Sequence, residues 1–240
     1  MRVSKKRISS STPTSQKINS TGCNEVYVEN HNGFMTIYKP YVGEKKRMRG
    51  TIRSDVPYYK REILAYELNC LFHWNIVPIT VETDGHKGIG SRQLWVKGKI
   101  NIYFDDDRCS NKVMQGFARM SFFDIVIGNT DRHAANWLVD FRGGKVWAID
   151  NGLCFPTKLD EIYFSIISSF KIRENNYSEF VERWLPLIQH DELEYMKTIG
   201  KRKFLNLFRK FDLEKEGKLA WERLQTLLSL VISNEESKAA

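Results

Sequence analysis

Residues Phe122–Phe155 read FFDIVIGNTDRHAANWLVDFRGGKVWAIDNGLCF, and the polar groups in this stretch decide how the chain is interpreted. Asp131 and Asn136 lie five residues apart on one short polar segment, and Asp150 follows at the end of an apolar run. ATP-dependent phosphoryl transfer needs one carboxylate to accept the proton of the acceptor hydroxyl, and an amide oxygen and a second carboxylate to hold Mg²⁺ against the phosphates. Mg²⁺ prefers such oxygen ligands and takes its remaining ligands from phosphate and water. The stretch therefore predicts a kinase that uses ATP and Mg²⁺.

The other half of a kinase site is expected nearer the N-terminus. Residues 34–40 read as a strand that carries Lys39 and ends at Pro40, which stops further strand pairing. A lysine in this position can hold the α- and β-phosphates as a compact positive charge. It needs a glutamate to aim it, and two candidates, Glu62 and Glu67, follow on the next predicted helix.

That helix is predicted over residues 58–74. Its apolar residues form one stripe at helical spacing, Leu64, Leu68, Leu71 and Phe72. Asp55 and Pro57 just before it are suited to capping and to the first turn.

The motifs described above resemble the catalytic core of phosphoinositide 3/4-kinase-like enzymes, and most closely the type II phosphatidylinositol 4-kinases and their bacterial protein-kinase-like relatives. The matching segments are Asn129–Arg132, Asn136–Leu138, Ala148–Leu153 with Phe155–Pro156, and Asn75–Pro78. The resemblance implies that Asp131 is the catalytic aspartate, that Asn136 is a metal ligand, and that Asp150 replaces the aspartate of the Asp-Phe-Gly motif of ordinary protein kinases. Counting back from Asn75–Pro78, it selects Glu62 as the partner of Lys39.

Two further parts of the site have alternative interpretations in the sequence. His133 stands where phosphoinositide 3-kinase-like enzymes, but not the type II enzymes, have a histidine, so it is assigned either to catalysis or to bracing the loop. No glycine-rich loop or P-loop signature is present. The candidate phosphate-covering loop is residues 20–24, with Ser20, Gly22 and Asn24 as ligands; a plain hairpin turn explains this segment equally well.

Composition indicates a globular catalytic unit. The chain has 240 residues, enough for two lobes, and 42% of them are hydrophobic. The four cysteines show no C-x-x-C spacing, which argues against a zinc site or a disulfide framework. No apolar run is long enough for a membrane span and no secretory leader follows the basic start, so we expect a soluble, cytoplasmic protein without a transmembrane segment.

The predicted fold class is α+β, a two-lobed protein-kinase-like fold with a small β-rich N-lobe that holds one helix, and a mostly helical C-lobe. Residues 1–19 are predicted to be a disordered basic tail rich in Ser and Thr, residues 20–96 the N-lobe and hinge, and residues 97–240 the C-lobe. The first strand is expected over residues 25–29. Leu94, Trp95 and Val96 belong to the expected hinge, whose backbone would bond adenine. Helices are expected over residues 112–128, 178–190, 192–211 and 217–233.

The acceptor is the least constrained part of the prediction. The chain lacks the cysteine-rich segment of type II lipid kinases, which favours a protein Ser/Thr hydroxyl, including its own, over a phosphoinositide. A nucleotidyl (AMP) transferase on the same fold would use the same metal ligands and stays open. The net charge of +8 lies largely in the tail, which could contact an anionic surface weakly; no motif for specific nucleic-acid binding accompanies it.

Overall fold

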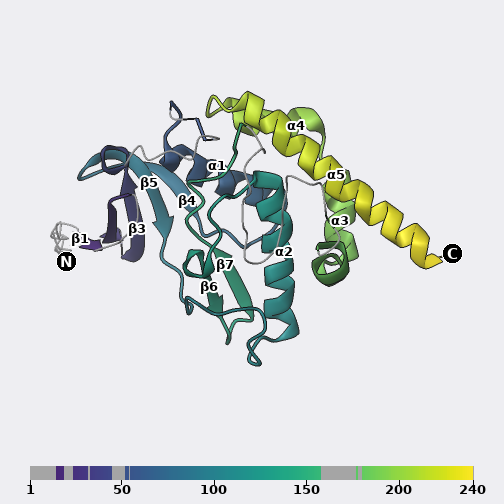
Figure 1. Ribbon diagram of the computed structural model, residues 1–240. Coiled ribbons are helices and arrows are strands. Elements are labelled where there is room, and N and C mark those ends of the chain that lie inside the picture. The colour runs from purple at the N-terminus through teal and green to yellow at the C-terminus, as the bar shows by residue number, and fades with distance from the viewer. Residues whose placement is uncertain are drawn as a thin grey trace, which may run out of the picture.

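The computed structural model describes residues 15–18, 24–31, 33–44, 52–53, 55–157, 177 and 180–239. Figure 1 shows a strand-rich part and a helix-rich part, with α1 and the β6–β7 ribbon between the sheet and the remaining helices. No helix within the described ranges is both long and apolar enough to span a lipid bilayer.

The strand-rich part is a five-stranded antiparallel sheet in the order β1-β2-β3-β5-β4. Its strands are β1 (Ser15–Ile18), β2 (Val26–His31), β3 (Phe34–Pro40), β4 (Thr80–Gly85) and β5 (Gly88–Leu94). Helix α1 (Tyr58–Leu71) packs against β4 and β5 and contributes its apolar stripe to the main core. The sheet and α1 together form the small lobe.

The helix-rich part is built around α2 (Asn111–Ile127), twelve of whose residues are buried. The ribbon of β6 (Trp137–Asp140) and β7 (Lys145–Ala148) packs on it. Helices α3 (His190–Lys197), α4 (Lys201–Arg209) and α5 (Glu214–Ala239) follow, preceded by a π-helical turn, Phe180–Trp184, and a 3₁₀ turn, Leu185–Leu187.

Several predicted boundaries are wrong. Residues 15–18, expected in the disordered tail, form β1, because pairing with β2 uses backbone groups and needs few apolar side chains. The other residues of the tail lie outside the described part of the chain. The helix predicted over 178–190 is replaced by the two short turns, since Pro186 cannot donate an α-helical hydrogen bond. The single helix predicted over 192–211 is two helices, α3 and α4, separated at Gly200.

The start of α1 also differs from prediction. Asp55 makes no cap; instead the carboxylate of Glu44 accepts hydrogen bonds from the backbone N–H groups of Tyr58 (2.9 Å) and Tyr59 (2.7 Å). The first N–H groups of a helix have no partner within it, so a carboxylate from another segment serves them here.

Candidate active site

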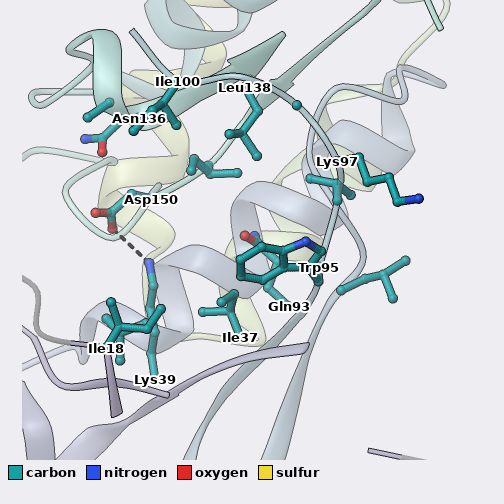
Figure 2. Close-up of a pocket in the computed structure, with 16 residues that line it drawn as sticks. Ile18, Ile37, Lys39, Gln93, Trp95, Lys97, Ile100, Asn136, Leu138 and Asp150 are labelled. Carbon is teal, nitrogen blue, oxygen red and sulfur yellow. Dashed lines mark hydrogen bonds and ion pairs between the residues drawn. The ribbon is translucent and has the colours of Figure 1, made fainter. Parts of the chain in front are cut away.

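A pocket of about 680 Å³ lies between the sheet and the helix-rich part. The sheet contributes apolar side chains, Lys39 and the end of β5, the segment that links the two parts contributes residues 95–98, and the far wall comes from the β6–β7 region. Figure 2 shows Ile37 and Lys39 on one side of this pocket, Trp95 beside the linking segment, and Asn136, Leu138 and Asp150 on the other side. Residues far apart in the sequence thus converge on one pocket.

Lys39 joins two carboxylates at the inner end of the pocket. Its Nζ lies 2.5 Å from Glu62 Oε1 and 2.9 Å from Asp150 Oδ1, and the Lys39–Asp150 pair is drawn as the dashed line in Figure 2. Glu62 is almost fully buried, and its other oxygen accepts a hydrogen bond from the backbone N–H of Asn151 at 3.2 Å. The alternative partner, Glu67, instead pairs with Lys210 at the surface.

The charges of this group depend on one another. Burial opposes the charge of the Lys39 ammonium, but Asp150 and Glu62 outweigh burial, so the pKa of Lys39 is raised above its ordinary value. Lys39 in turn holds the pKa of Asp150 below its ordinary value, against the effect of burial. Burial raises the pKa of Glu62 in spite of Lys39. Asp150 is therefore an anion at neutral pH and available to a cation.

Asp150 and Asn136 present their oxygens to the pocket by different means. Asp150 has a left-handed backbone conformation (φ 56°), which short polar side chains tolerate better than most. The Asn136 amide nitrogen donates to the backbone oxygen of Asp131 at 2.7 Å. This bond fixes the amide, and in Figure 2 its oxygen points toward the side of Asp150.

Asp131 lies on the loop between α2 and β6. Its backbone N–H donates to the Asn129 side-chain oxygen at 2.8 Å, which holds the turn. Gly128 begins this loop with φ 59°, and a Cβ there would lie 2.8 Å from Pro156, so only glycine fits. His133 Nε2 lies 3.9 Å from Asp131 Oδ2, too far for a hydrogen bond, while its Nδ1 accepts from the Ala135 N–H.

Arg132 is a residue whose importance the sequence reasoning missed. Its guanidinium is fully buried and bonds both oxygens of Asp124 on α2, at 2.9 and 3.0 Å. It also donates to the backbone oxygens of Asn136 (2.5 Å) and Ile149 (2.6 Å), and to the Asn151 side chain (2.5 Å). Arg132 therefore connects the segment of Asp131 and Asn136 to the segment of Asp150. A lone aspartate inside the apolar run 122–127 was the signal that could have revealed it.

The hinge residues Leu94, Trp95 and Val96 line the pocket as expected, but their backbone N–H groups differ in whether they already have a hydrogen-bond partner. The N–H groups of Leu94 and Trp95 are already bonded, to Ile79 O (2.8 Å) and Met35 O (3.0 Å). The N–H of Val96 has no hydrogen bond to any residue that the structure describes. Of the three predicted hinge residues, Val96 is therefore the one whose N–H is unpaired within the described part of the chain.

Of the predicted phosphate-covering loop, residues 20–24, the structure describes only Asn24. Ser20 and Gly22 lie outside the described residues. Asn24 forms a backbone bridge with Glu44 and does not line the pocket.

Comparison with known proteins gives concordant results. The sequence model of the family described as phosphatidylinositol 3- and 4-kinase matches residues 92–211. Protein Rv2133c of Mycobacterium tuberculosis is 29% identical over an alignment of 154 residues. The match covers 49% of this chain and 53% of that protein. Phosphatidylinositol 4-kinase gamma 3 of Arabidopsis thaliana is 33% identical over 96 residues, 38% of this chain and 14% of that enzyme. The chain thus spans about half the length of the first relative and much less of the plant enzyme.

Among solved structures, the Golgi casein kinase with Mn/ADP bound is similar in fold. The TM-score is 0.57 at 12% identity, over 93% of this chain and 73% of that one. The prediction of a two-lobed kinase-like fold is confirmed.

Proposed function

Because the chain belongs to the phosphatidylinositol 3- and 4-kinase family, we propose that it transfers the terminal phosphoryl group of ATP to a hydroxyl in a Mg²⁺-dependent reaction. The observation that carries this proposal is Lys39, held between Glu62 (2.5 Å) and Asp150 (2.9 Å) at the edge of the interlobe pocket. A lysine–glutamate pair beside a metal-binding aspartate is the arrangement that positions nucleotide phosphates in kinases.

The residues present fit a magnesium ion. Asp150 supplies an anionic carboxylate and Asn136 an amide oxygen whose orientation is fixed through its nitrogen. The described residues contain no cluster of three or more His, Cys, Asp or Glu side chains that could hold a metal without other ligands. Mg²⁺ suits such a sparse set because it keeps several waters and phosphate oxygens, and when bound it would neutralise phosphate charge. The Golgi casein kinase of similar fold was solved with Mn/ADP, which supports a nucleotide and a divalent metal at this site.

The remaining roles follow from position. Lys39 binds the α- and β-phosphates, and the Val96 N–H bonds the adenine. Asp131 accepts the proton of the acceptor hydroxyl as the new P–O bond forms and the bond to the departing ADP oxygen breaks. His133, which does not hydrogen bond the Asp131 carboxylate, braces the loop through Ala135.

For the acceptor we propose a protein Ser or Thr, including the Ser/Thr-rich residues of the chain's own N-terminal 19 residues. A phosphoinositide is the second candidate, and it is favoured by the family description and by the plant phosphatidylinositol 4-kinases. Transfer of AMP instead of phosphate would require the same metal ligands.

The test is incubation of the purified chain with labelled ATP and Mg²⁺, with protein substrates in one set of reactions and phosphatidylinositol vesicles in another. We expect label on protein, and intact-mass analysis that shows added phosphate. The Asp131→Asn variant serves as the control and should give no product while it still binds nucleotide. Labelled lipid without labelled protein would show that the acceptor is a phosphoinositide and not a protein. A product that carries AMP would show that the reaction is nucleotidyl transfer and not phosphoryl transfer. Unchanged turnover in Asp131→Asn would overturn the assignment of the site.

A further inference from the structure

A second pocket, of about 330 Å³, lies beyond the nucleotide pocket and shares no lining residue with it. Its walls come from the turn after α1, one face of α2, the β6–β7 turn and α3, elements that Figure 1 places in and beside the helix-rich part. The β6–β7 ribbon contributes to both pockets: Leu138 lines the nucleotide pocket, and Lys145 and Val146 line the second one. We call the latter the α2–β7 pocket.

Three cations line the α2–β7 pocket: Lys112 and Arg119 from α2, and Lys145 from β7. Glu192 is the one carboxylate in its wall, and it pairs with Arg119 Nε at 2.8 Å. The formal charge of the lining is therefore positive by two, with three cations against one carboxylate and His73 counted as neutral.

The hydrogen-bonding capacity of these cations is largely unused within the described part of the protein. Glu192 engages Nε of Arg119 and leaves both terminal guanidinium nitrogens without a hydrogen bond there. No described carboxylate forms an ion pair with Lys112 or with Lys145. Lys145 instead lies 3.8 Å above the Trp147 ring, and burial lowers the pKa of its ammonium. Arg119 is paired through Nε alone and the exposed Lys112 has no ion pair with a described residue, while Asp140 only partly offsets the effect of burial on Lys145. An anion that enters the pocket would therefore gain charge-assisted hydrogen bonds.

The backbone gives the pocket a recessed shape. Gly144 has φ 60°, and a Cβ there would lie 3.0 Å from Cβ of Lys112, so a larger residue would push the turn away from α2. Gly116 lets β7 approach α2 directly, since a Cβ at this position would lie 2.9 Å from Val146. The cations consequently surround a cavity instead of projecting from a convex surface.

We propose that the α2–β7 pocket is a docking site for an acidic side chain on a polypeptide partner, separate from the nucleotide site and independent of the function proposed above. The pocket has about half the volume of the nucleotide pocket, a size that suits one carboxylate-bearing side chain and its flanking backbone. Clusters of Arg and Lys recognise acidic motifs through charge-assisted hydrogen bonds. None of the large hydrophobic side chains that are exposed in the described structure belongs to this pocket, so nothing there would insert into a bilayer.

The experiment measures the binding of a fluorescein-labelled poly-glutamate peptide to the full chain by fluorescence polarisation, with poly-glutamine of equal length as the peptide control. The test variant is the double substitution Lys112→Glu with Lys145→Glu. The matched control is Lys201→Glu with Lys203→Glu, which makes the same change in net charge on exposed residues of α4 that line neither pocket. Circular dichroism establishes that both variants are folded.

We expect the wild type and the α4 variant to bind poly-glutamate alike, and the pocket variant to bind about tenfold more weakly or worse. Equal losses in both variants would show that only overall charge matters and would overturn the proposal, as would the absence of peptide binding by the wild type. A parallel assay uses phosphatidylcholine vesicles that contain phosphatidylserine. If Lys112 and Lys145 governed vesicle binding but not peptide binding, the partner would be a lipid surface and the proposal would be wrong.

Discussion

Glu62 contacts both sides of the interlobe pocket with a single carboxylate. One oxygen accepts from Lys39 and the other from the backbone N–H of Asn151, the residue that directly follows Asp150. The glutamate that holds the lysine therefore also fixes the backbone beside a predicted metal ligand. Because removing one partner of a buried ion pair leaves the other charge uncompensated, the two residues are expected to act as a unit.

A double-mutant cycle tests this coupling. We expect Lys39→Met and Glu62→Gln each to lower the rate of phosphoryl transfer strongly, and the double variant to be little worse than the more damaged single variant. The measurement is kcat/KM for ATP in all four proteins. Glu67→Gln is the matched control, since Glu67 lies on the same helix but pairs with the exposed Lys210, and it should be close to wild type. Effects that multiply would show that Lys39 and Glu62 work independently.

Whether a site residue can be recognised from the sequence depends on how far apart in the sequence its partners lie. Asp131, Asn136 and Asp150 can be recognised from the sequence because their chemistry is carried by a short stretch with fixed spacing. The role of Arg132 cannot, since its contacts combine Asp124 on α2 with carbonyl groups of two later segments. Only the folded chain brings these groups around one guanidinium.

Substituting Arg132 tests that role. Lysine keeps the charge in Arg132→Lys but cannot bond both oxygens of Asp124 and three further acceptors at once. We expect a loss of roughly 3 kcal/mol or more in the free energy of unfolding, measured by urea denaturation, because buried acceptors are left unpaired. Arg108→Lys, at an exposed ion pair with Asp106, is the control and should change stability only slightly. A similar small change for Arg132→Lys would contradict the bracing role.

At the scale of the elements, α1 is the helix that carries Glu62, and its N-terminus is held from outside by Glu44. Burial raises the pKa of the Glu44 carboxyl, although the N–H groups of Tyr58 and Tyr59 act in the opposite direction. The same residue forms a backbone bridge to Asn24, the last residue of the predicted phosphate-covering loop. Glu44 therefore links the start of α1 to the sheet side of the pocket.

Removing this cap should destabilise the protein in a specific way. We expect Glu44→Ala to lower the free energy of unfolding by about 1–2 kcal/mol, as for other N-terminal caps. Asp55→Ala removes the cap that the sequence predicted, and since Asp55 is exposed and pairs with Arg53, it should have a much smaller effect. The reverse order of effects in chemical denaturation would contradict the capping assignment.

The pH dependence of the same contact has a definite sign. A folded pKa above the ordinary value of 4.5 means that the folded chain binds the Glu44 proton more tightly than the unfolded chain. The contribution of the titration of Glu44 to stability is thus complete below pH 4.5 and is lost as the pH rises through the folded pKa. The stability of the wild type relative to Glu44→Gln should therefore fall as the pH rises from about 4 through this range. Denaturation at several pH values measures it, and a difference that stayed constant or rose would refute the assignment.

The helices show which boundaries the sequence can supply. The apolar spacing predicted α2 to within one residue at each end and the start of α1, since both helices contribute long runs to one core, but α1 ends at Leu71, three residues before the predicted end. The same spacing continues from α3 into α4 and so gave one helix instead of two. Gly200 is exposed and lacks a side-chain cap, and whether a chain turns at such a residue depends on the tertiary packing of the flanking helices.

At the scale of the whole molecule, α1 ties the sheet to the helix-rich part. Arg61 on α1 is fully buried and donates to the backbone oxygens of Cys154 (2.8 Å) and Phe155 (2.9 Å), just after Asp150. Adjacent to it, Glu62 bonds Asn151. Through Glu62, which also bonds Lys39, α1 therefore connects the two walls of the interlobe pocket, and residues of both lobes line that pocket. The exact lobe boundary, placed at residue 96 from the sequence, remains a proposal.

A ligand that bridges two lobes of the folded chain must stabilise it, since the unfolded chain offers no such site. At a nucleotide concentration about one hundred times Kd, the gain is about 2.7 kcal/mol, or roughly 5–10 °C in Tm for a chain of this size. We expect that rise with ATP and Mg²⁺ in a thermal-unfolding assay, and a smaller one with ATP and a chelator.

Asp150→Asn should lose the Mg²⁺-dependent part of the shift in Tm, because it removes the anionic oxygen. Asp131→Asn should keep the full shift, because Asp131 acts on the acceptor hydroxyl and not on the nucleotide. If both variants lost the shift equally, the separation between metal ligand and catalytic base would be wrong; if the wild type showed no shift, the pocket would not be a nucleotide site.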